Sequence, residues 1–133
     1  KLKEFAHSVG CEIKFLGELS DDELKKIYQK ADIFALASIP MPNSIEGFGF
    51  VYLEASAHGL PILAHRTGGV EDAVLDGKTG LLANPKSPDD LVQKLDQLIS
   101  DPSLRKSLVK NGLEWASLHD WEKVANRLYH STD

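Results

Sequence analysis

Two carboxylates with glycines between them are the residues of this sequence best suited to chemistry. Glu46 and Glu54 are separated by seven residues, and Gly47 and Gly49 follow the first of them. A glycine has no Cβ and lets backbone come close to a ligand, and the N–H groups of a helix that starts near Gly49 would favour a phosphate. Carboxylates accept hydrogen bonds from hydroxyls. The helical rise sets the two carboxylates far enough apart to reach from a sugar to a ribose across a diphosphate, so the arrangement suits a nucleotide sugar.

The segments around this motif predict strands and helices in alternation. Short apolar runs predict strands over residues 11–16, 32–37, 61–64 and 80–83. Helical patterns fall over residues 1–9, 20–30, 49–58 and 70–75, and Ser20 with Glu23 forms a capping box for the second. This order predicts an α/β fold, a Rossmann-like parallel sheet with flanking helices. Ligands of such sheets bind beyond the carboxyl ends of the strands, where the loop 38–49 should lie.

The last third of the sequence predicts helices. Ser87 precedes Pro88, and Asp101 precedes Pro102, which are N-cap and first-turn residues of two helices. Asp120 is the predicted cap of a third helix. We therefore expect one partial nucleotide-sugar-binding domain over 1–133, with a strand and helix core at about 11–84 and C-terminal helices at about 87–130.

Composition excludes several classes of partner. The chain has 133 residues, 42% of them hydrophobic, and a net charge of -5, which leaves no basic surface for nucleic acid or an anionic membrane. No apolar run approaches a membrane span. Cys11 is the only cysteine, so we expect it to be buried and the chain to work in a reducing, cytoplasmic compartment. The five histidines have no metal-ligand spacing.

The central motif resembles that of a known enzyme family. The run 44–55 is similar to the Glu-x7-Glu signature of retaining glycosyltransferases of the GT-B fold, in group 1 (family 4). Residues 58–62, 67–69 and 76–82 continue the same family order, and the resemblance covers about residues 1–130. It implies the donor-binding half of a hexosyltransferase that acts on a nucleotide diphosphate sugar and needs no metal.

The resemblance also implies roles for individual residues. Glu46 would contact the transferred sugar and stabilise its developing positive charge, and Glu54 would bind the ribose hydroxyls. Backbone N–H groups would hold sugar and phosphate oxygens, and the loop after the first strand would lie near the base. The residues implied in donor binding are Gly47, Phe48, Gly49, Phe50, Val51, Glu54, Leu16 and Gly17.

The sequence departs from the family at its start. The family's C-terminal domain opens with a strand that ends in Gly-Arg, followed by Lys-Gly, and these cations bind the diphosphate. No such segment precedes Lys1, and the N-terminal acceptor domain is not in the sequence either. Since the cationic clamp stabilises the leaving group, we predict that this polypeptide alone transfers no sugar at a useful rate and is a fragment or one chain of a split enzyme. Arg66 and Lys78 are the basic residues near the predicted rim, and we assign neither to this role.

The same departure predicts an incomplete sheet. In the usual order 3-2-1-4-5-6 the absent strands would lie between 11–16 and 32–37. Those two strands would then pair directly, exchange with another molecule, or leave edges exposed. We expect self-association or a distorted sheet.

Two other functions fit less well. A GT-B nucleotide-sugar epimerase matches the Gly-Phe-Gly block less closely, and a phosphorylase would need a pyridoxal-phosphate lysine that is not evident. A non-catalytic nucleotide-sugar-binding subunit or scaffold is the remaining alternative. Neither the base, the sugar nor the acceptor follows from the sequence.

Overall fold

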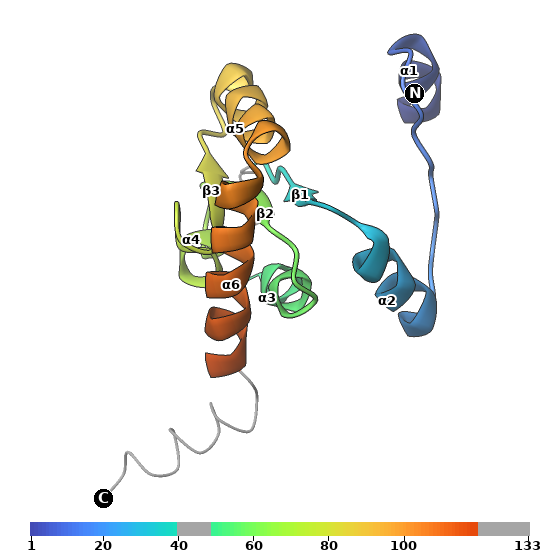
Figure 1. Cartoon of the computed structure of the whole chain (residues 1–133). Coiled ribbons are helices and arrows are strands. Elements are labelled where there is room, and N and C mark those ends of the chain that lie inside the picture. Colours follow the sequence, from blue (N-terminus) through green and yellow to red (C-terminus); the bar gives the residue numbers. More distant parts are fainter. Residues whose placement is uncertain (40–48, 120–133) are drawn as a thin grey trace, which may run out of the picture.

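The fold is a small parallel sheet with helices on both faces (Figure 1). The computed structural model describes residues 1–39 and 49–119. The strands are β1 (Phe34–Leu36), β2 (Ile62–His65) and β3 (Gly80–Ala83), all parallel and in the order β1-β2-β3. The helices are α1 (Leu2–Ser8), α2 (Asp21–Lys30), α3 (Phe50–Ala57), α4 (Val70–Ala73), α5 (Pro88–Ser100) and α6 (Pro102–Leu118). The predicted α/β class and parallel sheet are confirmed.

The central strand divides its side chains between two apolar clusters. Ile62 and Ala64 pack with residues of α3 and α4, whereas Leu63 packs with Leu98 of α5 and Leu108 of α6. All four residues of β2 are buried, and so are all four of β3. Apolar residues at successive positions are what a parallel strand covered on both faces requires.

The predicted caps are confirmed where the structure describes them. Ser20 N–H donates to Glu23 Oε2 at 2.9 Å, which closes the capping box of α2. Asp101 Oδ1 accepts from Leu104 N–H at 2.9 Å, and Ser87 starts α5 in the same way. The helix predicted after Asp120 lies outside the described residues.

The first predicted strand is wrong. Residues 11–16 form an extended segment without strand pairing, and this segment and α1 lie apart from the sheet (Figure 1). A strand exists only where a neighbour takes its backbone hydrogen bonds, and within the described structure β1 pairs with β2 alone. Cys11 is consequently exposed, against our expectation, and Ala35 of β1 is exposed as well. The sequence predicted direct pairing of these two strands, exchange with another molecule, or exposed edges. The structure shows the last of these, because no described strand covers the free edge of β1.

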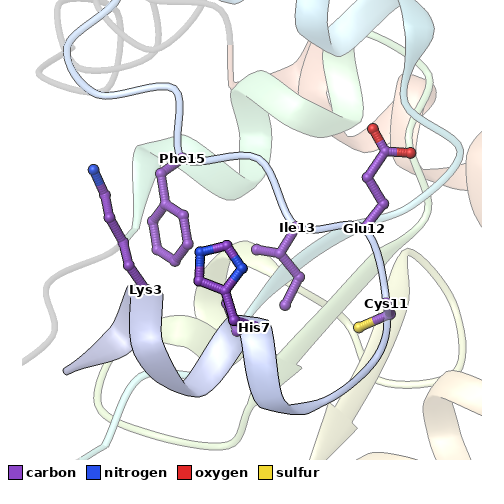
Figure 2. Close-up of a pocket in the computed structure, with 7 residues that line it drawn as sticks. Lys3, His7, Cys11, Glu12, Ile13 and Phe15 are labelled. Carbon is purple, nitrogen blue, oxygen red and sulfur yellow. The ribbon is translucent and has the colours of Figure 1, made fainter.

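The detached segment carries an apolar surface. Phe15 and Ile13 point toward α1 and line a hollow of about 490 Å³ beside Lys3 and His7 (Figure 2). Six large apolar side chains of α1 and residues 9–16 are at least 44% exposed: Leu2, Phe5, Val9, Ile13, Phe15 and Leu16. Exposed apolar side chains in this number favour association.

We therefore predict that the chain self-associates. Light scattering should give a mass above the 14.6 kDa of one chain, because the β1 edge and the apolar α1 segment both favour contact with a second copy. Phe5→Ser should reduce the association, whereas Ile99→Ser, at a side chain of α5 that is 60% exposed, should not. A clean monomer with an intact central sheet would contradict the prediction.

Candidate functional site

Gly49 sits at the start of α3 in a conformation that favours glycine. Its φ of 72° and ψ of 58° are left-handed, and its carbonyl accepts a hydrogen bond from Tyr52 N–H at 3.0 Å. A Cβ at this position would lie 2.6 Å from Cδ2 of Tyr52, closer than side-chain atoms approach. Both the backbone turn and the packing therefore require glycine here.

Tyr52 attaches the start of α3 to the carboxyl end of β1. Its side chain is fully buried, and its hydroxyl lies 3.4 Å from the carbonyl oxygen of Leu36, the last residue of β1. Its ring meets the ring of Phe34 edge-on, with centroids 6.1 Å apart. The N-terminal turn of α3 thus lies at the edge of the sheet where ligands of parallel sheets bind.

Glu54 faces α2 from the middle of α3. It lines a cavity of about 290 Å³ together with Lys25, Tyr28 and His58. The Tyr28 hydroxyl lies 3.5 Å from Glu54 Oε2, at the limit of a hydrogen bond, and the Tyr28 ring stacks on His58 with centroids 4.9 Å apart. The predicted ribose-binding carboxylate therefore opens into a hollow between two helices.

Burial is the main cause that raises the pKa of Tyr28, and the negative charge of Glu54 and its hydrogen bond act in the same direction. The Tyr28 hydroxyl therefore stays protonated and can donate to the carboxylate. Neither Tyr28 nor His58 was among the predicted site residues. The sequence nevertheless contains features that could have indicated them. Tyr28 is on the inward face of its helix, and His58 follows Glu54 by one helical turn.

The other predicted site residues divide into those that the structure describes and those that lie outside it. Glu46, Gly47 and Phe48 lie outside the described residues. Phe50 is 63% exposed at the first turn of α3, and Val51 packs against the core. Leu16 and Gly17 belong to no strand and lie in the connection between α1 and α2, so a role near the base stays a prediction.

The ends of β1 and β2 are connected at the same edge. His65, the last residue of β2, has its Nδ1 at 2.9 Å from the carbonyl oxygen of Ser38. Arg66 follows, and its guanidinium pairs with the carboxylates of Glu71 and Asp76. The hydrogen bond to Glu71, more than any other contact, raises the pKa of Arg66. With both carboxylates bound, Arg66 is poorly placed to hold a diphosphate, and we assign it no such role.

Two features are absent from the residues that the structure describes. Across 1–39 and 49–119, no three His, Cys, Asp or Glu side chains come together as a metal site would require. Within the same residues, no helix has the length and apolar character to cross a bilayer.

The fold and the position of the α3 turn define a class of protein. The parallel sheet with flanking helices matches the C-terminal half of GT-B glycosyltransferases: the sucrose-phosphate synthase from Thermosynechococcus elongatus superposes with a TM-score of 0.80, at 29% identity over 98% of this chain and 33% of that one. The sequence model of the family "Glycosyl transferases group 1" matches residues 1–115. The chain belongs to this family.

Individual relatives are longer than this chain. A D-inositol 3-phosphate glycosyltransferase of Corynebacterium urealyticum is 38% identical over 96% of this chain and 29% of its own length. An uncharacterized glycosyltransferase of Methanocaldococcus jannaschii is 39% identical over 84% of this chain and 30% of its own length. The structure of Anabaena HepE with UDP-glucose has a TM-score of 0.75 at 24% identity, which shows a shared fold. The chain thus spans about three tenths of the curated relatives it matches.

Proposed function

We propose that this chain binds the nucleotide diphosphate sugar of a retaining, family 4 glycosyltransferase that transfers a hexose to an acceptor without a metal. The observation that supports this most is the group 1 match over 1–115, together with a glycine-capped helix start at the carboxyl edge of the sheet. Glu54 opens into a cavity one to two helical turns from that start. The proposal assigns the ribose hydroxyls to Glu54 and the diphosphate to the amides near Gly49.

Glu46 takes the catalytic role in this proposal. A carboxylate beside the transferred sugar would stabilise the positive charge that develops as the bond to the diphosphate breaks. Gly47, Phe48, Gly49, Phe50 and Val51 would present backbone N–H groups to the sugar and phosphate, and Leu16 with Gly17 would lie near the base. The chain alone is expected to bind the donor weakly and to transfer no sugar, because no basic residue of the described chain is assigned to the diphosphate; Arg66, at this edge, is already paired with Glu71 and Asp76.

Donor titration tests the proposal. UDP-glucose, ADP-glucose and GDP-mannose are titrated by ligand-observed NMR, the first chosen from the HepE complex and the last because a Mycobacterium tuberculosis relative, 32% identical, is GDP-mannose-dependent. Glu54→Gln is expected to weaken binding about ten- to one hundredfold, the range of a lost hydrogen bond to a charged group. Glu114→Gln, at an exposed position of α6, is the matched control and should bind as the wild type.

The alternatives give different results. Binding of none of the three nucleotide sugars would reject the donor domain and favour the scaffold. Unchanged binding by Glu54→Gln would reject the ribose assignment. Interconversion of the bound sugar without an acceptor would point to the epimerase.

A further inference from the structure

Thr67 carries a buried hydroxyl without a hydrogen-bond partner. The residue is 8% exposed, and its Oγ1 has neither solvent contact nor a hydrogen bond. Among the described residues it is the one side-chain polar atom in this condition. An unsatisfied buried polar group is destabilising, and in native structures such groups call for an explanation. Valine has the same shape without the hydroxyl. Threonine at this position therefore adds nothing to the stability of the fold that valine would not provide.

Thr67 lies at the ligand-binding edge of the sheet. It follows β2 by two residues, and its carbonyl accepts from Val70 N–H at 3.1 Å to start the turn into α4. The end of β2 is held to Ser38, beyond β1, through His65. The start of α3 is held to the end of β1 through Tyr52 and Leu36. Thr67 and the Gly49 turn therefore lie at the same edge of the sheet.

We infer that Thr67 Oγ1 is a binding group for an oxygen of the nucleotide sugar, either a phosphate oxygen or a sugar hydroxyl. This inference rests on the proposed function. A threonine hydroxyl can donate to a phosphate oxygen and can donate to or accept from a sugar hydroxyl. The neighbouring cation cannot easily take this place, because Arg66 is paired with two carboxylates. The ligand oxygen would supply the partner that the free chain lacks.

The test compares Thr67→Val with Thr67→Ser. Each is titrated with the nucleotide sugar that the wild type binds and with the corresponding nucleoside diphosphate, and its Tm is measured without ligand. Thr67→Val should bind roughly three- to tenfold more weakly, as for the loss of one hydrogen bond, while its Tm rises by about 2–6 °C because an unpaired polar group is removed. Thr67→Ser keeps the hydroxyl and should bind within about twofold of the wild type. Weaker binding of the diphosphate as well as the sugar nucleotide assigns the contact to phosphate, and weaker binding of the sugar nucleotide alone assigns it to the sugar.

Two results would overturn the inference while the proposed function stands: equal binding by wild type and Thr67→Val, or a lower Tm for Thr67→Val, which would mean that the hydroxyl is paired within the fold. A wild-type chain that binds none of the nucleotide sugars would overturn the proposed function and this inference with it.

Discussion

Gly80→Ala is expected to lower the free energy of unfolding by about 3 kcal/mol, the upper part of the range for overpacking a core. Gly80 begins β3, and a Cβ there would lie 2.7 Å from Cγ1 of Val74 and 2.8 Å from both Cβ and the carbonyl oxygen of Ile62. Ile62 is paired with Gly80 across the parallel ladder, so its backbone cannot move without breaking that pairing. The added methyl group must therefore push β2 and β3 apart at this pair or displace Val74.

Gly112→Ala is the matched control for Gly80→Ala. Gly112 is buried inside α6, but a Cβ there would have Ser56 Cβ as its nearest neighbour at 3.5 Å, an ordinary contact. Alanine in a helix interior is favoured over glycine by about 0.8–1 kcal/mol, so this variant should be slightly more stable than the wild type. Urea unfolding followed by circular dichroism measures both variants. Equal stability of Gly80→Ala and the wild type would mean that β2 and β3 are less closely paired than the structure shows.

Local chemistry allowed much of this fold to be predicted. The capping box at Ser20 and Glu23 and the Asp101-Pro102 pair are signals within one helical turn, and both helices begin where these residues predict. Every residue of β2 and β3 is buried, so the apolar character of these two segments alone was sufficient to predict them as strands. The start of a helix near Gly49 was also correctly predicted from the helical pattern that follows the glycines, whereas the left-handed conformation of Gly49 was not predicted.

The errors have a different physical origin. Residues 11–16 have the composition of a strand, but strand formation depends on a neighbour that the residues themselves do not encode. The surroundings of Glu54 were missed for a related reason. Tyr28 is 26 positions away in sequence, and only the packing of α2 on α3 brings its hydroxyl to the carboxylate. The roles of Glu46, Gly47 and Phe48 stay predictions, since these residues lie outside the described structure.

Gly49→Ala is expected to reduce both stability and donor binding. The left-handed conformation disfavours alanine by about 1–2 kcal/mol. The added Cβ also meets the Tyr52 ring at 2.6 Å, and Tyr52 is buried against Phe34 and Leu36, so the ring has little room to move. The backbone strain and the clash with the Tyr52 ring together should lower the free energy of unfolding by about 2–4 kcal/mol. Because relief of the clash must displace the first turn of α3, the proposed donor site should lose its geometry, and nucleotide-sugar binding should fall by more than in Glu54→Gln.

Gly77→Ala separates the two causes of this loss. Gly77 has the same φ of 72°, but a Cβ there would have no neighbour within 4 Å. This variant should therefore lose only the backbone contribution, about 1–2 kcal/mol, and should bind the nucleotide sugar like the wild type. Urea unfolding and donor titration of both variants give the comparison. If Gly49→Ala were no less stable than Gly77→Ala, the Tyr52 ring would not pack against Gly49 as described, and if it bound donor normally, the start of α3 would not be where the diphosphate is held.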